Sequence, residues 1–369
     1  MMKKCNYRLS VIPVVVLLMS LLLFGCGSAT KPSDSGENST TSVSQDATAA
    51  PAETKEQDQS DIVELEKVTF RLNWTAQGSH APIFYGIDQK IFEKYGIDLE
   101  AGEGKGSGNT VNLVATKGDT IGYADCNSIF NLITQDAPVK VIAPVYTKLS
   151  SGVISIKENN ITKPEDIKGK TIGITEGDGP HKLFGAFLKS VGIDEKDVTL
   201  MPMDATAKVP ALLNKQVDAI LGGFDDQPFQ IEAKGFEPTV IAYADYGVTC
   251  VGMSLVAHND TISENPDMLK NFVQAYAESW SAAYKNPDAA LDSLIKRFPD
   301  MDMTTATNQL NSGFDCLLAN PGDDIANVDE QEFLDSIQLF KNYTGLSADA
   351  KAEDLFTTEF MPSGIKLEK

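Results

Sequence analysis

The segments Asp119-Thr120-Ile121-Gly122-Tyr123 and Asp218-Ala219-Ile220-Leu221-Gly222 decide the fold, because each is the exit of a helix that feeds a short apolar strand ending in small residues. Around each segment, predicted strands and helices alternate along the chain. Such alternation is typical of a mainly parallel sheet with helices on both faces. Two copies of the pattern therefore predict an α/β protein with two similar, doubly wound lobes.

The predicted strands fall into two groups of four, at residues 68–74, 97–103, 120–124 and 139–146, and then at 170–175, 198–203, 219–223 and 239–243. A further strand is expected at residues 253–257, after which the chain becomes helical. Asn265-Pro266 and Asn286-Pro287 each place an N-cap residue before a proline at the first helical position. Large apolar residues recur between them at helical spacing, which predicts a helix with one buried face.

We expect this helical tail to pack back on the first lobe, which makes that lobe discontinuous. The first lobe is predicted to hold residues 63–152 and 248–369, and the second lobe residues 153–247. The chain would cross between the lobes near Gly152 and Gly247. A hinged ligand cleft between the two lobes is the expected result.

The N-terminus has the three parts of a secretory signal. Basic Lys3, Lys4 and Arg8 precede an apolar run from Val11 to Phe24 and a small residue before Cys26. This exit resembles the bacterial lipobox, which predicts a lipoprotein signal peptide at residues 1–25 and a lipid on Cys26. The alternative is a single transmembrane anchor, but the run is shorter than the roughly 20 residues that a span needs. We therefore expect a lipid-anchored protein on the extracytoplasmic face of the cell membrane.

Residues 26–62 are mostly small or polar, a composition that predicts a disordered linker. Without the three basic residues of the leader, 28 basic residues face 52 acidic ones. This excess of negative charge disfavours binding to nucleic acid or to anionic lipid and favours a soluble monomer. Beyond Cys26 the cysteines are Cys126, Cys250 and Cys316, which we interpret as buried small hydrophobic residues because they show no metal-ligand spacing.

Several motifs resemble the SsuA/ThiY-type, or NMT1-like, substrate-binding proteins of ABC importers. The motifs are Arg71-Leu72-Asn73-Trp74-Thr75, His80-Ala81-Pro82-Ile83-Phe84, Gly104-Lys105-Gly106-Ser107 and Asp166-Ile167-Lys168-Gly169-Lys170. The resemblance implies a two-lobed periplasmic-binding-protein type II fold that binds sulfonate, nitrate, taurine or a thiamine pyrimidine precursor. It also implies a permease and an ATPase as partners, and neither a cofactor nor a metal.

The spacing of Trp74 and His80 is most similar to the thiamine-pyrimidine branch, although Ala76 and Gln77 replace that branch's proline and asparagine. The branch also includes intracellular pyrimidine synthases with a cysteine-rich motif near the second crossing. This chain has only Cys250 there. The resemblance therefore favours a binding protein over an enzyme.

Ligands in doubly wound sheets bind beyond the carboxyl ends of the strands, so the turns that follow the strands supply the candidate site. The candidate ligand-binding residues are Asn73, Trp74, His80, Tyr85, Gly106, Ser107, Asp125, Asn127, Glu176, Asp178 and Asp225. Trp74 could stack on a flat ring or fill the core of its lobe. His80 could bind the ligand edge or cap a helix, Tyr85 could equally be core, and Gly106 could serve an anion site or a plain turn.

Acidic residues gather at turns of the second lobe, where Asp226 follows Asp225. Carboxylates would accept hydrogen bonds from amino groups and would repel an oxyanion. Arginine, the usual clamp for oxyanions, is limited to Arg71 and Arg297 after the leader. The sequence thus favours an amino-bearing aromatic heterocycle, such as a thiamine pyrimidine precursor. A sulfonate, taurine or nitrate binding protein and a pyrimidine-synthase-like enzyme are the alternatives.

Overall fold

The computed structural model describes residues 65–318 and 322–368. These residues belong to one compact unit that spans Asp61–Lys369. The signal peptide predicted at residues 1–25 and the lipidation predicted at Cys26 lie outside the described residues, and so does the linker predicted at residues 26–62.

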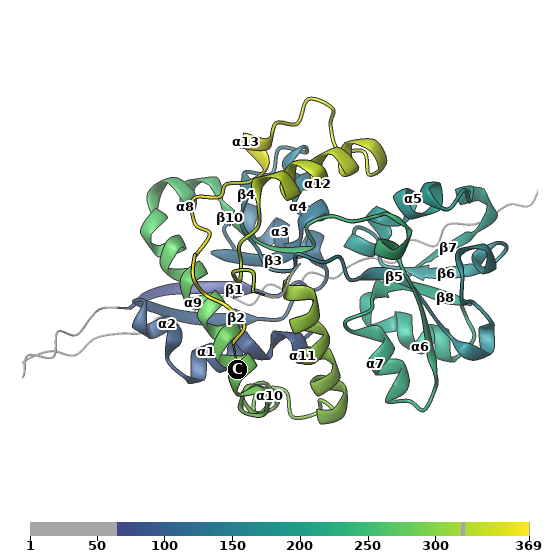
Figure 1. Ribbon diagram of the computed structural model, residues 1–369, viewed down its shortest axis with the longest axis horizontal. Coiled ribbons are helices and arrows are strands. Elements are labelled where there is room, and N and C mark those ends of the chain that lie inside the picture. The colour runs from purple at the N-terminus through teal and green to yellow at the C-terminus, as the bar shows by residue number, and fades with distance from the viewer. Residues whose placement is uncertain (1–64, 319–321, 369) are drawn as a thin grey trace, which may run out of the picture. The chain divides into compact units, whose positions relative to one another are not determined.

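The unit contains two five-stranded sheets in which equivalent strands occupy equivalent positions (Figure 1). The sheet of the first lobe has the order β2 (Ile97–Gly102), β1 (Glu66–Arg71), β3 (Ile121–Asp125), β10 (Met253–His258), β4 (Val139–Pro144). The sheet of the second lobe has the order β7 (Thr199–Pro202), β6 (Thr171–Ile174), β8 (Ala219–Gly223), β5 (Ser151–Ile156), β9 (Pro238–Ala242). The predicted α/β architecture with two similar lobes is confirmed.

Each sheet is mixed, whereas the sequence predicted mainly parallel sheets. β10 is antiparallel to β3 and β4, and β5 is antiparallel to β8 and β9, while the other pairs are parallel. Both antiparallel strands come directly after a passage of the chain between the sheets, at residues 145–150 and 247–252. β5 was absent from the predicted strands, because its first residues Ser151 and Gly152 give no apolar signal.

Helices cover both faces of each sheet (Figure 1). In the first lobe α3 (Ser107–Ala115) and α4 (Cys126–Ile133) cover one face. The other face carries α1 (Ala81–Asp88), α2 (Ile91–Lys94) and the long α9 (Pro266–Lys285). In the second lobe α5 (Gly179–Ser190) lies on one face, with α6 (Lys208–Leu213) and α7 (Gln227–Glu232) on the other.

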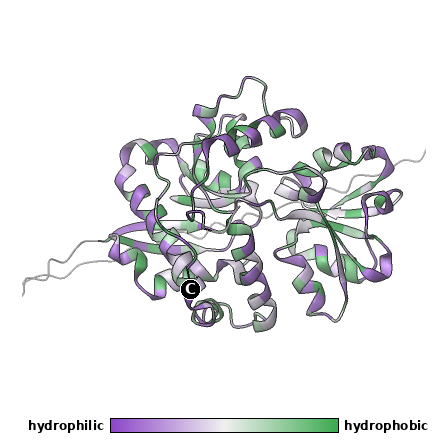
Figure 2. Ribbon diagram, viewed as in Figure 1, coloured by the Kyte–Doolittle hydropathy of each residue, from purple (hydrophilic) through white to green (hydrophobic). Residues whose placement is uncertain are grey.

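The remaining helices follow β10 or connect strands. They are α8 (Asn259–Glu264), α10 (Pro287–Ile295), α11 (Met303–Leu317), α12 (Glu330–Tyr343) and α13 (Ala352–Leu355), with the 3₁₀ turns η1 (Gly78–His80), η2 (Lys157–Asn159), η3 (Pro164–Ile167), η4 (Glu195–Asp197), η5 (Ala205–Ala207) and η6 (Tyr243–Tyr246). Colouring by hydropathy shows apolar strand centres in both sheets and polar residues along the outer sides of many helices (Figure 2).

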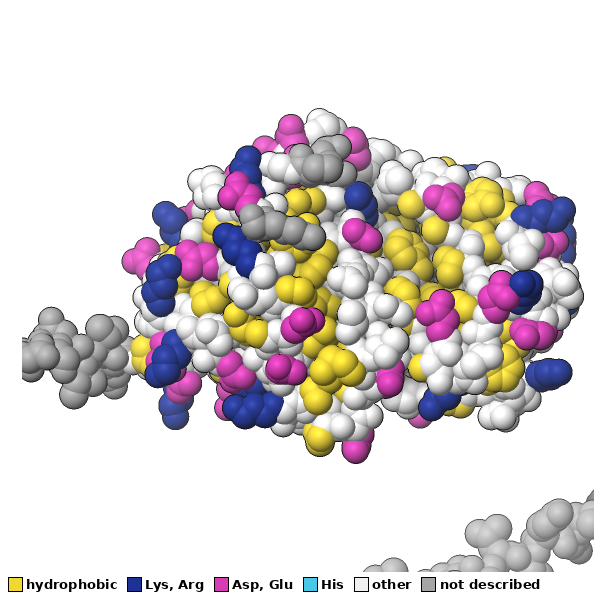
Figure 3. Space-filling model, turned by 60° about the horizontal axis from the view of Figure 1, so that its bottom comes forward, with side chains coloured by type: hydrophobic (Ala, Val, Ile, Leu, Met, Phe, Trp, Pro, Cys, Tyr) yellow, Lys and Arg dark blue, Asp and Glu magenta, His cyan; other side chains and the backbone are white. Residues whose placement is uncertain are grey.

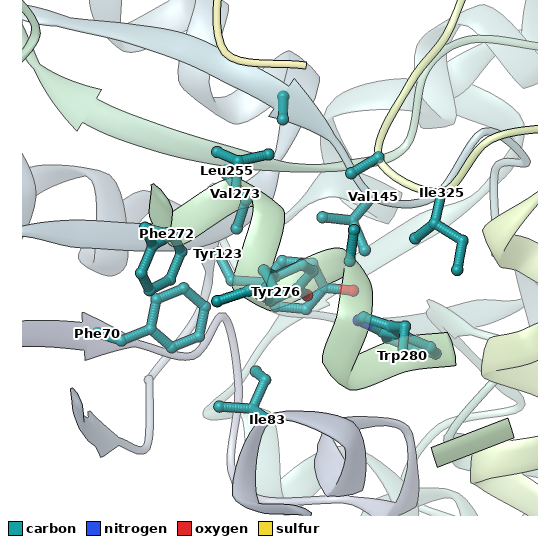
Figure 4. Packing of buried hydrophobic residues seen from close by; sticks show 14 of the residues in the cluster. Phe70, Ile83, Tyr123, Val145, Leu255, Phe272, Val273, Tyr276, Trp280 and Ile325 are labelled. Carbon is teal, nitrogen blue, oxygen red and sulfur yellow. The ribbon is translucent and has the colours of Figure 1, made fainter. Parts of the chain in front are cut away.

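The core of the first lobe is built around α9 (Figure 4). Phe272 packs against Phe70 of β1 with ring centroids 5.5 Å apart, and Tyr276 packs 6.1 Å from the same ring. One turn further on, Trp280 is fully buried and meets Tyr146 edge-on. The apolar stripe that the sequence places on this helix is therefore the face that covers the first sheet, and this part of the tail packs as predicted.

The tail also contacts the second lobe, which the sequence did not predict. α12 packs against α4 of the first lobe through Phe340 and Phe130, whose ring centroids are 5.9 Å apart. The same helix contacts α5 of the second lobe, where the Lys189 ammonium lies 4.9 Å from the centre of the Tyr343 ring. One apolar cluster consequently runs from the first lobe through the two chain passages into the second.

Acidic and basic side chains are interspersed over the face shown in Figure 3, with apolar side chains between them. Within the described residues no helix combines the length and the apolar character that a membrane crossing requires. Cys126, Cys250 and Cys316 are free thiols; Cys126 and Cys316 are buried and Cys250 is half-buried. Burial raises the pKa of Cys126 and Cys250 well above the ordinary thiol value.

Phe272→Ala is expected to lower the free energy of unfolding by about 3–5 kcal/mol, because it removes a fully buried ring between α9 and the first sheet. Urea denaturation followed by circular dichroism measures the loss. Leu334→Ala on an exposed position of α12 is the control and should change stability by less than about 0.5 kcal/mol. Equal losses in the two variants would contradict this account of the core.

Candidate ligand-binding cleft

A cavity with a volume of about 80 Å³ lies between the two lobes and is partly open to solvent. Its walls come from the loops after β1, β3 and β8 and from the starts of α3 and α5, as the carboxyl-end rule predicts. Six of the candidate residues line it: Asn73, Trp74, Ser107, Asp125, Asp178 and Asp225. The first four belong to the first lobe, whereas Asp178 and Asp225 belong to the second.

Trp74 is positioned by two neighbouring loops of the first lobe. The N–H groups of Gly104 and Gly106 donate hydrogen bonds to the carbonyl oxygens of Trp74 and Asn73, each at 2.9 Å. Gly106 has φ of 112°, a conformation that favours glycine, and a Cβ there would lie 3.9 Å from the Trp74 ring. Gly106 therefore lies beside the Trp74 indole and holds its loop through the bond to Asn73. It is not among the residues that line the cavity, so the ligand contact predicted for it has no support from its position.

Lys208 of α6 is the basic side chain of the cavity wall, and its side chain is 1% exposed. The ammonium donates hydrogen bonds to Asp178 Oδ2 at 3.1 Å and to the carbonyl oxygen of Leu221 at 2.8 Å. It also lies 5.1 Å from the centre of the Trp74 ring, across the cleft from its own lobe. This cation–π contact joins the second lobe to the aromatic wall of the first.

Four carboxyl groups surround the cavity. Asp125 caps α4, with Oδ1 accepting from Ser128 N at 2.8 Å, and Asp178 caps α5, with Oδ1 accepting from His181 N at 3.0 Å. A Cβ on Gly179 would lie 2.4 Å from Asp125 Oδ2, so the Asp125 carboxyl presses on the N-terminus of α5. Burial raises the pKa of Asp125 to about 6, that of Asp225 to about 6 and that of Asp226 to about 7.

Both arginines of the described residues lie away from the cavity. Arg71 Nε donates to Asp119 at 2.8 Å, and Arg297 pairs with Asp88 at 2.7 Å. Neither guanidinium is among the groups that line the cleft. The electrostatics of the cavity are consequently set by four carboxyl groups and by one ammonium that Asp178 already neutralises.

Comparison with known protein families shows which family the chain belongs to. The model of the family described as "NMT1/THI5 like" matches residues 77–290, which is more than half of the chain and includes most of the cavity wall. The chain belongs to the NMT1/THI5-like family. The resemblance stated from the sequence motifs is thereby confirmed.

Relatives of this NMT1/THI5-like chain include proteins whose names state a ligand or a reaction. It is 23% identical to the riboflavin-binding protein RibY of Chloroflexus aurantiacus, over 94% of this chain and 97% of the relative. It is 20% identical to a formylaminopyrimidine-binding protein of Halalkalibacterium halodurans, over 81% and 92% of the two chains. A 4-amino-5-hydroxymethyl-2-methylpyrimidine phosphate synthase of Schizosaccharomyces pombe is 25% identical over 60% and 66%.

The fold is that of the periplasmic binding proteins. The alkanesulfonate-binding protein SsuA of Xanthomonas axonopodis pv. citri, solved with bound MOPS, superimposes with a TM-score of 0.66. The two chains are 12% identical, and the match covers 79% of this chain and 98% of the other. The predicted two-lobed fold of the NMT1/THI5-like chain is confirmed by this likeness.

His80 lies behind the cavity wall, so the direct ligand contact predicted for it does not match its position. Its Nδ1 accepts from Gln77 N at 3.3 Å, which leaves Nε2 to carry the proton and donate to Asn73 Oδ1 at 3.0 Å. Burial lowers the pKa of His80 to about 3, so the ring is neutral. His80 therefore orients Asn73, which does line the cavity.

Three further candidates are also absent from the cavity wall. Tyr85 is packed in the core of the first lobe. Asn127 is buried beneath α12, where its Oδ1 accepts from Asn131 at 2.7 Å and from Thr344 at 2.8 Å. Glu176 is exposed and lines an outer groove instead. The binding roles predicted for these side chains thus have no support from their places in the fold.

Lys208 brings a buried positive charge to the cavity wall, and it was not among the residues that the sequence predicted for the site. A single lysine at the start of a short helix is usually solvated, and nothing in its neighbours marks it as buried. Gln77 and Gln227 line the cavity as well, and both are buried. The Oε1 atom of Gln227 has no hydrogen-bond partner.

Because the cavity holds buried carboxyl groups, we expect the free energy of unfolding to fall as pH rises. Folding raises the pKa of Asp125, Asp225 and Asp226 and lowers that of His80, so three groups bind protons more tightly and one less tightly, and the folded chain binds more protons than the unfolded chain between about pH 4 and pH 7. The free energy of unfolding should therefore be higher at pH 5 than at pH 8, by at least about 1 kcal/mol. Urea denaturation at the two pH values measures the difference.

Asp226→Asn should shrink this difference, because an amide does not titrate. Asp166→Asn is the matched control, since hydrogen bonds from Thr162 and Lys163 lower the pKa of this exposed carboxyl and it stays ionised throughout the range. A pH dependence that is the same in both variants would show that Asp226 is not the group responsible.

Proposed function

We propose that this protein is the solute-binding component of an ABC importer, which captures a small molecule between its lobes and delivers it to a permease driven by an ATPase. The observation that supports this most strongly is the cavity between two lobes, which the chain joins in the described residues through the passages at 145–150 and 247–252. Such lobes can rotate about the passages, and a ligand that contacts both lobes favours the closed arrangement. The protein performs no reaction on the ligand.

The proposal includes a place on the extracytoplasmic face of the cell membrane. The leader-like residues 1–25 and the small residue before Cys26 are the features that support a lipid anchor. Residues 26–62 would then act as a spacer between the anchor and the folded unit. A monomer is sufficient for this role, because each chain has a complete cavity.

We propose an amino-bearing aromatic heterocycle, such as a thiamine pyrimidine precursor, as the ligand. Trp74 offers an aromatic wall, and Asp125 and Asp225 offer buried acceptors for amino or ring N–H groups. Both arginines are paired outside the cavity. The relatives whose names include riboflavin and formylaminopyrimidine point to nitrogen heterocycles as well.

The position of Lys208 restricts how such a ring can stack. With the ammonium 5.1 Å from the centre of the Trp74 ring, no second ring fits between them, since stacked ring centres are themselves about 4.5 Å apart or more. A flat ligand therefore uses the opposite face of Trp74 or displaces Lys208. The ammonium is held by Asp178 and Leu221, so the first arrangement costs less.

A thermal-shift screen of the full-length chain in detergent tests this function. We expect the melting temperature to rise with 4-amino-5-hydroxymethyl-2-methylpyrimidine or formylaminopyrimidine, because a ligand that binds the folded state at 100 times its Kd adds about 2.7 kcal/mol of stability. Riboflavin, taurine, an alkanesulfonate and nitrate are screened beside them. Trp74→Ala should abolish the shift.

Trp280→Phe is the control, since Trp280 is buried in the first-lobe core away from the cavity and its loss should leave the ligand shift intact. A shift with an oxyanion alone that survives Trp74→Ala would overturn the heterocycle proposal and support a sulfonate, taurine or nitrate binding protein. Consumption of the pyrimidine or release of a product would instead support an enzyme.

A further inference from the structure

Gln309 of α11 contacts both lobes through the two ends of one amide group. Its Oε1 accepts a hydrogen bond from Gly78 N at 2.8 Å, and its Nε2 donates to Asp226 Oδ1 at 2.6 Å. Gly78 belongs to the first-lobe turn that follows the Trp74 loop, and Asp226 begins α7 of the second lobe. The side chain is 3% exposed, so this bridge is shielded from water.

Asp226 needs this bridge to be fully hydrogen-bonded. Within its own lobe it accepts from Gln227 Nε2 at Oδ2 and from Gln230 Nε2 at Oδ1, each at 2.7 Å. Gln309 supplies the third donor, and it comes from the other lobe. The carboxyl group is 3% exposed and lines the cavity, so a lost donor would leave a buried charged oxygen with fewer partners.

The same helix is rigidly joined to the loop that carries Trp74. A Cβ on Gly78 would lie 1.8 Å from the carbonyl oxygen of Ala306, so the backbone of η1 rests directly on the first turns of α11. Gln309 follows Ala306 by three residues and faces the same side of the helix. Movement of α11 therefore moves the Trp74 loop.

The C-terminal end of α11 holds the first chain passage. The N–H groups of Thr147 and Lys148 donate to the carbonyl oxygen of Cys316, at 3.1 and 3.2 Å. One helix thus touches the Trp74 loop, the second lobe and a passage about which the lobes would rotate. It lies beyond residue 290, where the match to the family model ends.

We propose that Gln309 is a positioning residue that latches the two lobes closed, by bonding Asp226 of the second lobe while it fixes the Trp74 loop of the first. Gln309 does not itself line the central cavity. A second hydrogen bond between the lobes, from Ser128 Oγ to the carbonyl oxygen of Gly177 at 3.2 Å, uses residues that line a different, outer groove. The latch rests on the proposed function only in treating the lobes as a hinged pair.

The test measures how accessible Trp74 is in the full-length chain without any ligand. The sequence has two tryptophans, and Trp280→Phe leaves Trp74 as the single tryptophan, which is excited selectively at the red edge of the absorption band. In that background and at a pH of about 8.5, where Asp226 is ionised, Gln309→Glu places a second carboxylate against Asp226 and should open the cleft. We expect the acrylamide quenching constant of Trp74 to rise about two-fold or more, because loss of a hydrogen bond to a charged group changes an equilibrium by about ten-fold or more.

A compensating pair makes the test specific to the latch. Adding Asp226→Asn to Gln309→Glu restores one donor, one acceptor and a single negative charge at the contact, so quenching should return toward the parent value. Gln309→Leu removes the donor without adding charge. If Gln309→Glu does not fold, the quenching constant of Trp74 is measured in Gln309→Leu instead. Gln338→Glu, at an exposed position of α12, is the control for an added carboxylate on a tail helix.

Urea unfolding of each variant separates closure from general stability. A latch predicts greater quenching of Trp74 under native conditions in Gln309→Glu and Gln309→Leu, with recovery in the compensated pair. Quenching equal to the parent in both single variants, or no recovery in the pair, would overturn the proposal even if the urea midpoints fall. Because no ligand is present, either result leaves the ligand screen to decide the proposed function by itself.

Discussion

The structure depends on two antiparallel strands that the chain inserts into the two sheets immediately after it passes between them. β5 pairs with β8 and β9, and β10 pairs with β3 and β4, so each passage ends inside a sheet and not at its edge. The passages are thereby fixed to the rigid part of both lobes. The loops after β1, β3 and β8 consequently face one another across a short distance, and the cavity forms between them.

Burial gives that cavity its chemical character. Carboxyl groups that would be solvated on an open surface are enclosed here, and burial raises the pKa of Asp125, Asp225 and Asp226. Lys208, the buried ammonium of the cavity wall, is bonded to Asp178 and to the Leu221 carbonyl, and it faces the Trp74 ring. The cavity therefore offers acceptors and an aromatic wall, and the proposal of a flat ligand with N–H donors rests on this combination.

Local patterns in the sequence were sufficient for the architecture. The repeated exit segments that begin at Asp119 and Asp218 lead into β3 and β8, which occupy equivalent central positions in the two sheets. Asn73, Trp74 and Asp125, which the turns after strands indicated, line the cavity, and their contact with a ligand stays a prediction. The mixed character of the sheets could not be predicted in the same way, because strand pairing is a long-range property and β5 begins with Ser151 and Gly152.

Residues whose roles arise from tertiary packing were predicted poorly. His80 is close to the cavity in sequence, yet it faces Asn73 and Gln77 from behind, and no local pattern distinguishes these two orientations. Lys208 and Gln309 are ordinary residues for the surface of a short or amphipathic helix, and each becomes significant only because a distant segment buries it. A sequence pattern records which face of a helix is apolar, but it does not record which polar residue at the edge of that face meets a partner.

The tail beyond residue 290 contacts both passages of the chain between the lobes. α11 bonds the first passage at Thr147 and Lys148, and Ser336 of α12 accepts from Val251 N of the second passage at 2.9 Å. α12 also lies against α5 of the second lobe through the Lys189–Tyr343 contact. Because both passages are held by tail helices, rotation of the lobes must strain or release these contacts. Most of the cavity wall thus lies within the family region, while helices of the tail contact both passages and both lobes.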